Sequence, residues 1–309
     1  MTVNRATALG PRKVFERHGF QAARRGHDFL TKGSNMPAIQ RSQDWGRCKP
    51  RGLAAVGIGL TRRRLVRGAL RRLVGNAVSG MQPCFDVEID GLKMRCMARD
   101  NYTEWGLVFT GARQDCSGRD TILSALAPGD VFVDVGANCG AYSLFAARRV
   151  GATGCVLAIE PMPEMIARLR FNVRANGFAN VQIFETAIGP EAGSATLFVD
   201  TARRGHSSLI ALDGATSTTV PVAPLLSIVT QARIDRIDAL KIDVEGYEDR
   251  ALLPFIATAE RRLWPQRIFM EITWQSRWQT DCVSRLQAAG YRVAWQGRGD
   301  VLLQLPRTT

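Results

Sequence analysis

The chain has 309 residues, 46% of them hydrophobic and 22% charged, which is the composition of a globular protein with a substantial core. This length predicts one large domain or two smaller ones. The longest apolar run, residues 53–60, is interrupted by glycines and falls well short of the roughly 18–20 residues that a membrane-spanning helix needs. Residues 1–35 also lack the apolar core and cleavage site of a secretory signal.

The formal net charge of +13 is concentrated at the N-terminus. Residues 1–80 contain 17 Lys and Arg against 3 Asp and Glu, whereas residues 81–309 contain 24 against 25. The basic pI therefore says nothing about the ligand of the main domain, which we place at residues 81–309. Residues 1–60 show no sustained hydrophobic period, and we expect them to be a disordered basic arm.

Residues 61–80 predict a basic amphipathic helix, because leucine and valine recur at steps of three and four among six arginines. Such arginines bind anionic lipid or the phosphates of a nucleic acid. Alternatively, the apolar stripe packs on the domain and the arginines are only solvated. No part of the arm interleaves aromatic with basic side chains as a base-stacking surface does. This favours packing, with contact to an anionic surface as the alternative.

The cysteines are scattered, and none of them forms a C-x-x-C pair. The seven are Cys48, Cys84, Cys96, Cys116, Cys139, Cys155 and Cys282. Their odd number and wide spacing indicate reduced thiols, not a disulfide framework or a zinc site. We therefore expect a cytoplasmic protein.

The main domain opens with an alternating segment, residues 85–97, that predicts a hairpin around Gly91. A short helix over residues 120–126 follows, after which strands and helices alternate. Apolar runs predict strands at 131–135, 155–159, 181–184, 239–244 and 268–272, with a short extra strand at 195–199, helices at 142–150, 163–176 and 249–258, and a C-terminal antiparallel hairpin at 291–295 and 301–305. The alternation predicts an α/β fold with a mostly parallel sheet covered by helices on both faces. Ligands bind such sheets beyond the carboxyl ends of the strands.

A glycine-rich turn, Asp134-Val-Gly136-Ala-Asn138-Cys-Gly140, joins the first buried strand to a helix, where backbone can approach a ligand closely. Its spacing is G-x-N-x-G, not the G-x-G-x-x-G of a dinucleotide-binding loop. Asp134 would repel a pyrophosphate but suits an ammonium or a sulfonium. Glu160 ends the second strand 24 residues after Gly136, where an acidic side chain accepts hydrogen bonds from a ribose diol. Together these residues predict S-adenosylmethionine as the ligand.

A second group of charges, Lys241, Asp243 and Glu245, ends another apolar strand just before Gly246. Period two places the three side chains on one side of the strand, where burial is costly unless they are paired. Asp243 and Glu245 are our candidate catalytic residues, because methyl transfer to an aliphatic hydroxyl needs a base for its proton. Either carboxylate could instead orient the substrate or hold a metal, and we assign no metal ligand.

Several other side chains have two interpretations each. His206 is either a base near the substrate or a solvated loop side chain. Trp274 and Trp278, together with Arg277, form either a wall of the substrate site or, as we favour, part of the packing. Tyr142 either touches the cofactor or lies in the core.

Four segments resemble the FkbM family of methyltransferases in sequence, order and spacing, over roughly residues 120–273. They are VFVDVGANCGAYSLFAA, AIEPMPEMIARLRFNVRANG, the SSL at 207–209 and LKIDVEGYEDRALL. The resemblance implies a class I, Rossmann-like methyltransferase fold with a seven-stranded sheet, which uses S-adenosylmethionine and usually methylates a hydroxyl oxygen. Asp134, Gly136, Asn138, Gly140 and Glu160 fall on the family's cofactor motif, and Asp243, Glu245 and Gly246 on its D-V-E-G motif.

The chain departs from the family in one stretch: where members usually have an acidic T-L-D-D-like segment, residues 222–228 read VAPLLSI. The leading interpretation is an O-methyltransferase acting on a small molecule, sugar or lipid-linked glycan. An NAD(P)-dependent oxidoreductase is the enzymatic alternative, since this architecture serves many chemistries. The other alternative is a non-catalytic protein with a degenerate methyltransferase fold that binds nucleic acid or a membrane. The presence of all four acidic motif residues favours the enzyme.

Overall fold

The computed structural model describes residues 44–111, 116–200, 207–211 and 214–306, and residues 116–119 of these by their backbone alone. All of them lie in one compact unit, Pro37–Thr309. Most of the arm that we expected to be disordered, residues 1–43, falls outside this description. None of the described helices has the length and apolarity to cross a bilayer.

A seven-stranded sheet in the order β12-β13-β11-β10-β3-β4-β5 forms the centre of the fold. Five strands run parallel, whereas β13 is antiparallel to both of its neighbours. The strands are β3 (Val131–Val135), β4 (Cys155–Ile159), β5 (Val181–Phe184), β10 (Ala239–Ile242), β11 (Arg267–Glu271), β12 (Arg292–Gln296) and β13 (Asp300–Gln304). The structure thus confirms the predicted α/β fold of class I methyltransferases, with its mostly parallel sheet and its C-terminal antiparallel hairpin.

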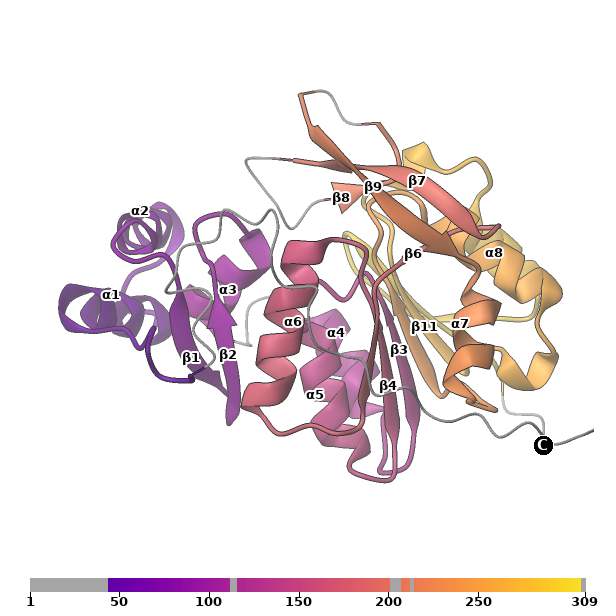
Figure 1. Ribbon diagram of the computed structural model, residues 1–309, viewed down its shortest axis with the longest axis horizontal. Helices are drawn as coiled ribbons and strands as arrows, with labels where there is room; N and C mark the ends of the chain where they lie inside the picture. The colour runs from indigo at the N-terminus through magenta and orange to yellow at the C-terminus, as the bar shows by residue number, and fades with distance from the viewer. Residues whose placement is uncertain (1–43, 112–115, 201–206, 212–213, 307–309) are drawn as a thin grey trace, which may run out of the picture. The chain divides into compact units, whose positions relative to one another are not determined.

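Alternate residues of each central strand enter two different cores, as the period of a strand requires. Phe132 packs with α5 on one face of the sheet, while Val133 and Val135 pack with α7, α8 and α9 on the other. Figure 1 shows α4, α5 and α6 on one side of the strands and α7 and α8 on the opposite side. The helices are α4 (Cys116–Ser124), α5 (Ala141–Val150), α6 (Pro163–Ala175), α7 (Leu225–Ala232), α8 (Glu248–Thr258) and α9 (Cys282–Ala288), with 3-10 turns η1 (Arg261–Leu263) and η2 (Gln275–Arg277).

A second sheet of four strands follows β5, in the order β6-β9-β7-β8. The expected strand at 195–199 is part of β7 (Gly193–Val199), and its long partner β9 (Thr216–Ala223) was not predicted. The other members are the short β6 (Ala187–Ile188) and β8 (Ser207–Ser208). The end of β9 and the start of α7 occupy the stretch in which the family's acidic segment is missing.

The N-terminal part of the unit contains two helices in place of the single helix that we expected over residues 61–80. Helix α1 (Gly52–Arg62) begins inside the expected arm, and α2 (Gly68–Ser79) starts after a turn. Arg64 adopts a left-handed backbone (φ 59°), which ends the helical path after α1. Gly57 permits close packing of the two helices, because a Cβ there would lie 2.5 Å from Cγ2 of Val78.

The predicted hairpin at 85–97 is confirmed as β1 (Phe85–Ile89) and β2 (Leu92–Cys96), which form a separate antiparallel pair. Asp90 and Gly91 both have positive φ in its turn, as a tight two-residue hairpin requires. Helix α3 (Tyr102–Thr110) follows and was not predicted.

Cys48 and Cys84 form a disulfide, with their Cα atoms 5.7 Å apart. Our expectation of reduced thiols is therefore wrong for this pair, and the inference of a cytoplasmic location loses that support. Buried Asp86 brings the two segments together, since its Oδ2 accepts hydrogen bonds from the amides of Gly46 and Cys48. Free cysteines among the described residues are Cys96, Cys139, Cys155 and Cys282.

Candidate functional site

One cleft lies beyond the carboxyl ends of β3, β4 and β10, where the fold predicts a ligand site. Five predicted site residues line it: Gly136, Asn138, Glu160, Asp243 and Glu245. Thr186, Ala187, Ile188, Leu197, Ser207, Ser208, Leu209 and Tyr247 complete much of the lining. Asp134 and Gly140, also predicted, do not line this cleft.

Gly136 is required by the way in which the loop meets the next strand. Its φ is 78°, and a Cβ there would lie 2.0 Å from the carbonyl oxygen of Asp243. Its amide donates to the carbonyl oxygen of Ile159 at 3.0 Å, which ties the loop to β4. The loop backbone is therefore held at the edge of the cleft between β4 and the acidic turn after β10.

Gly140 serves the helix that follows the loop. It is the N-cap of α5 with φ 94°, and a Cβ there would lie 2.6 Å from Cδ1 of Leu169. This glycine lets α5 pack closely on α6 and does not reach the cleft. It affects the site only indirectly, because it helps to set the position of the loop.

Asp134 is fully buried beneath the loop and faces protein partners. The hydroxyl of Ser143 donates to its Oδ2 at 2.6 Å, and Nζ of Lys241 lies 3.5 Å from Oδ1. Burial raises the pKa of Asp134, and the Lys241 ammonium and the Ser143 hydrogen bond oppose this. The geometry therefore makes Asp134 the partner of Lys241.

Lys241 connects the loop, Asp134 and the acidic turn. Its Nζ donates to the carbonyl oxygen of Gly136 at 2.6 Å and lies 3.6 Å from Oδ2 of Asp243. Burial lowers the pKa of Lys241, but Asp243 and Asp134 outweigh it and raise the pKa above its ordinary value. The ammonium also lies 5.4 Å from the ring centre of Tyr142, which packs against the core and is absent from the cleft lining.

Glu160 presents its carboxylate at the end of β4. Oε2 accepts the amide of Asn138 at 2.8 Å, and Oε1 accepts the amide of Met162 at 3.0 Å. Burial raises the pKa of Glu160 to about 7, although both amides oppose the rise. Since each carboxylate oxygen has two lone pairs, Glu160 can still accept hydrogen bonds from a ligand.

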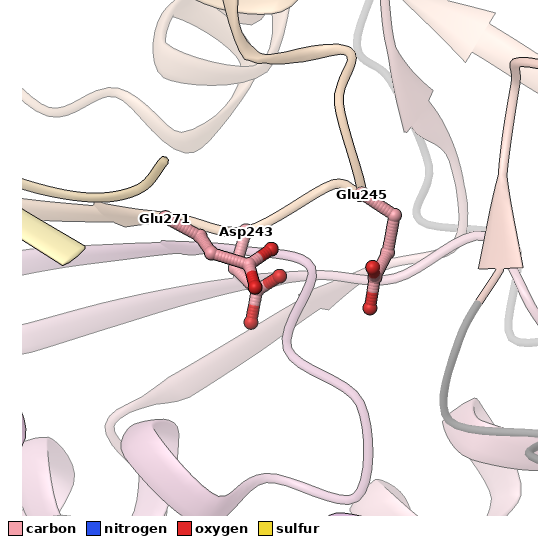
Figure 2. Close-up of side chains that lie close together, drawn as sticks. All are labelled: Asp243, Glu245 and Glu271. Atoms are coloured by element: carbon pink, nitrogen blue, oxygen red, sulfur yellow. The ribbon is translucent and has the colours of Figure 1, made fainter. Parts of the chain in front are cut away.

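Three carboxylates meet on the other side of the cleft. Asp243, Glu245 and Glu271 each place an oxygen within 4.8 Å of the others, and Figure 2 shows them around one space. Burial, followed by the charges of Asp243 and Glu245, raises the pKa of Glu271 to about 10. Glu271 is thus protonated at neutral pH, which relieves repulsion in the group. Oxygen ligands of this kind also suit a hard divalent cation.

Sequence reasoning missed Glu271, although a signal was present. It is the last residue but one of the strand predicted at 268–272 and the last residue of β11, and carboxyl ends of parallel strands share one edge. What was lacking was the knowledge that β11 lies next to β10.

The SSL segment lies against the D-V-E-G turn. The hydroxyl of Ser208 donates to the carbonyl oxygen of Glu245 at 3.1 Å, so two segments that carried the resemblance contact each other in space. Glu245 has a left-handed backbone with φ 57°. His206, our other candidate base, lies outside the described residues.

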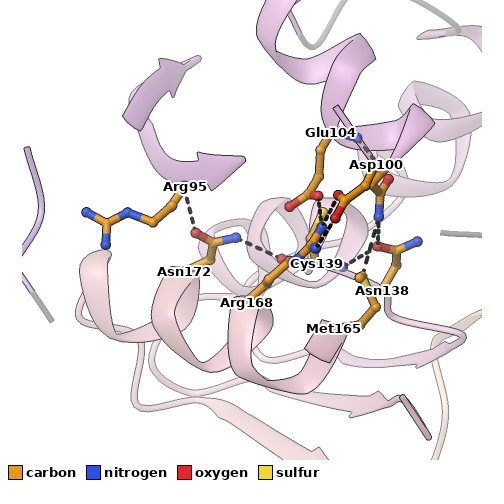
Figure 3. A network of polar contacts seen from close by, with 9 residues as sticks. Arg95, Asp100, Glu104, Asn138, Cys139, Met165, Arg168 and Asn172 are labelled. Carbon is orange, nitrogen blue, oxygen red and sulfur yellow. Dashed lines mark hydrogen bonds and ion pairs between the residues drawn. The ribbon is translucent and has the colours of Figure 1, made fainter. Parts of the chain in front are cut away.

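A buried network couples the N-terminal elements to the glycine loop. Nδ2 of Asn101 donates to Oδ1 of Asn138 at 2.9 Å, and Oδ1 of Asn101 caps α3 by accepting the amide of Glu104. Figure 3 shows Arg168 of α6 reaching both Glu104 and Asp100. Burial raises the pKa of Glu104 to about 7 against the effect of Arg168. This network joins residues far apart in sequence, which is why no local pattern indicated it.

The tryptophans after β11 support the acidic turn and do not line the cleft. Nε1 of Trp278 donates to Glu248 at 2.7 Å, and the Arg277 guanidinium lies 4.0 Å above the ring of Trp274. A Cβ at Gly246 would meet Cδ of Arg277 at 2.8 Å. This arrangement agrees with the packing interpretation.

The chemistry of the lining fits S-adenosylmethionine. Glu160, whose carboxylate can accept hydrogen bonds, lies on one side, and the carboxylates of Asp243 and Glu245 lie on the other, where positive charge is favoured. Apolar side chains such as Ile188 and Leu209 line the cleft together with polar ones, as in most cofactor sites.

The sequence profile of the methyltransferase FkbM domain matches residues 134–293, just over half of the chain. This match includes the glycine loop, Glu160, the SSL segment and the acidic turn. The chain therefore belongs to the FkbM family of methyltransferases, and S-adenosylmethionine is its cofactor.

Other known proteins are similar over shorter stretches. An arsenite methyltransferase from Halobacterium salinarum is 31% identical over 140 residues, which are 41% of this chain and 35% of that protein. Protein-L-isoaspartate O-methyltransferase 2 from Archaeoglobus fulgidus is 38% identical over 61 residues, 20% of this chain and 28% of that protein. The chain thus spans only about a third of the length of these curated relatives.

Two solved structures are similar at low identity. A SAM-dependent O-methyltransferase from Thermotoga maritima matches with a TM-score of 0.39 and 17% identity, covering 62% of this chain and 66% of that chain. A putative O-methyltransferase from Klebsiella pneumoniae matches with a TM-score of 0.40 and 14% identity, covering 82% and 97%.

Proposed function

We propose that this chain transfers the methyl group of S-adenosylmethionine to a hydroxyl oxygen of a small molecule, sugar or glycan, with Asp243 or Glu245 as the base. One observation carries the proposal: both carboxylates line the same cleft as Gly136 and Glu160. When bound, S-adenosylmethionine supplies an electrophilic methyl carbon. A base in the same cleft can take the proton of the hydroxyl as the new carbon–oxygen bond forms.

In this proposal Glu160 accepts hydrogen bonds from the ribose diol with the lone pairs that the amides of Asn138 and Met162 leave open. Gly136 and Asn138 bring loop backbone to the cofactor at positive φ. Asp134 acts indirectly. It pairs with Lys241, and Lys241 donates a hydrogen bond to the carbonyl oxygen of Gly136.

Asp243 and Glu245 are the candidate bases because both are accessible from the cleft. The side chain of Asp243 is 41% exposed, so an acceptor can reach it. Glu271, kept protonated by burial and by its two neighbours, cannot compete for the proton at neutral pH.

The first test is calorimetric binding of S-adenosylhomocysteine to the full chain, with NAD⁺ as the control ligand. We expect binding of the first alone. Binding of NAD⁺ alone would favour the oxidoreductase alternative. Binding of neither ligand by a folded sample would favour the degenerate, non-catalytic alternative.

The second test measures methyl transfer from labelled S-adenosylmethionine to a panel of hydroxylated acceptors. The variants Asp243→Asn and Glu245→Gln are compared. A positioned base contributes roughly 10²–10⁴-fold to the rate, so the variant that removes the base should lose about that factor in kcat. Its affinity for S-adenosylhomocysteine should change less than kcat does. Asp235→Asn, which changes an exposed aspartate that does not line the cleft, is the matched control. If both site variants keep full turnover, neither carboxylate is the base.

A further inference from the structure

The first two helices carry an exposed apolar surface that the cleft does not use. The large exposed hydrophobic side chains of the described residues are Leu53, Val56, Leu65, Leu70, Leu73, Met81, Tyr102 and Val293. Five of these lie on α1, on α2 or in the turn between the two helices. Leu53 is 76% exposed, Leu65 68% and Leu73 67%. Exposed apolar side chains on two helices that pack against each other indicate an interaction surface.

The exposure of these side chains is not a result of poor packing, because each helix packs against the protein with another of its faces. Gly57 of α1 packs against Val78 of α2, and a Cβ at Gly75 would lie 2.4 Å from the ring of Trp105 in α3. The exposed pairs Leu53 and Val56, and Leu70 and Leu73, are three residues apart and form a second row on each helix. The helices are thus docked by small residues and present large ones outward.

Basic residues lie among the exposed leucines along this part of the chain. Residues 44–80 contain nine Lys and Arg and a single acidic residue, Asp44. Arg62 is used internally, since it donates to the carbonyl oxygens of Leu107 and Val108. Arg63, Arg64 and Arg72 are exposed. We call these three arginines, together with Leu53, Val56, Leu65, Leu70 and Leu73, the basic-leucine surface.

We infer that the basic-leucine surface docks on an anionic lipid bilayer, with its leucines in the interface and its arginines at the lipid phosphates. Helices with this combination lie in the plane of a membrane surface, held by apolar burial and by attraction to anionic headgroups. A nucleic acid accounts for the arginines but offers nothing to the leucines. Residues 51–80 also contain no aromatic side chain on which bases could stack.

The test is sedimentation of the full chain with vesicles of phosphatidylcholine, with and without 30% phosphatidylglycerol. Wild-type protein should bind the anionic vesicles at least about tenfold more strongly than the neutral ones, and 0.5 M salt should weaken this binding. Failure to bind anionic vesicles overturns the inference.

Two variants separate the contributions of the surface. Leu70→Ser with Leu73→Ser should weaken vesicle binding at least about tenfold, because apolar area no longer enters the interface. Val293→Ser, which changes an exposed apolar residue on β12, should have no effect. Arg63→Gln, Arg64→Gln and Arg72→Gln together should remove the preference for anionic lipid, whereas the triple change of exposed Arg285, Arg292 and Arg298 to Gln should leave it intact.

Other occupants give different results. If the leucine variant keeps full vesicle binding while the arginine variant loses it and also loses RNA binding, the surface serves a nucleic acid and the inference is wrong. If wild-type protein is a dimer that does not bind vesicles and the leucine variant is a monomer, a second copy of the chain covers the surface. Binding of S-adenosylhomocysteine is also measured on every variant. Loss of vesicle binding with normal S-adenosylhomocysteine binding therefore concerns the basic-leucine surface and not the proposed methyl transfer.

Discussion

The carboxyl edge of the central sheet and the basic-leucine surface both depend on charge, but they use it in opposite ways. At the sheet edge, Asp134 and Lys241 are buried and each has named partners within a few ångströms. In the turn after α1 and on α2, Arg63 and Arg72 are exposed to solvent, and their effect on binding depends on how many such charges there are. Buried charges fix one geometry and are costly to disturb, whereas exposed charges act collectively and tolerate single changes.

The sharpest test of this contrast removes one cation from each region. Lys241→Met should destabilise the fold by about 3–5 kcal/mol, because the buried carboxylate of Asp134 loses its partner. Arg72→Gln should change stability by no more than about 0.5 kcal/mol. Urea denaturation of the two variants measures both effects, and equal losses would contradict the contrast.

The next largest effect concerns the loop that Lys241 holds. Gly136→Ala adds a Cβ 2.0 Å from the carbonyl of Asp243, whereas Gly177→Ala meets no atom within 4 Å at a similar φ of 67°. Gly177→Ala should therefore cost only the backbone strain of about 1–2 kcal/mol. Gly136→Ala should cost about 1–3 kcal/mol more and should abolish S-adenosylhomocysteine binding. Similar unfolding free energies for the two variants would show that the loop gives way easily.

Removal of an anion from the cleft should weaken cofactor binding. Glu160→Ala should weaken S-adenosylhomocysteine binding by roughly 1.5–3 kcal/mol, the value of hydrogen bonds to a charged acceptor. Calorimetry gives the affinity, with exposed Glu191→Ala as the control. Unchanged affinity in Glu160→Ala would mean that the ribose lies elsewhere.

The smallest effect at any one step is a pH slope, because one titrating group changes the unfolding free energy by at most about 1.4 kcal/mol per pH unit. Because the pKa of Glu271 is raised to about 10 in the fold and is near 4.3 in an unfolded chain, the native state holds a proton that the unfolded state releases between these values. The contribution of Glu271 to stability is therefore complete below about pH 4 and is lost as the pH rises toward 10. Glu271→Gln should flatten this decline in unfolding free energy, and an identical pH profile would show that Glu271 ionises in the fold.

The central fold was predictable because its strands are continuous apolar runs. The predicted strand at 131–135 coincides with β3, all of whose residues are buried. In contrast, α9 was missed because it has seven residues only and two buried positions, Cys282 and Leu286. The helix predicted over 61–80 begins too early. The apolar periodicity of the sequence continues through the turn at Arg64, so the pattern did not reveal that turn.

The candidate site was predictable only where its residues form a motif within a short stretch of sequence. The glycine loop, Glu160 and the D-V-E-G turn stood out by spacing, and five of their residues line the cleft. The buried role of Asp134 depends on strand pairing, because β10 and β3 place Lys241 opposite Asp134 in register. The contact between Asn101 and Asn138 likewise needs tertiary structure, and no motif precedes it.

The Cys48–Cys84 disulfide closes a covalent ring around both helices of the basic-leucine surface. A protease that cuts in the exposed turn at Arg63 or Arg64 would break the peptide chain within this ring. The two fragments would stay linked by the disulfide. Trypsin-nicked protein should therefore run as one band in a non-reducing gel and as two after reduction. The ring tethers α1 to the rest of the protein even when the peptide chain beside it is broken.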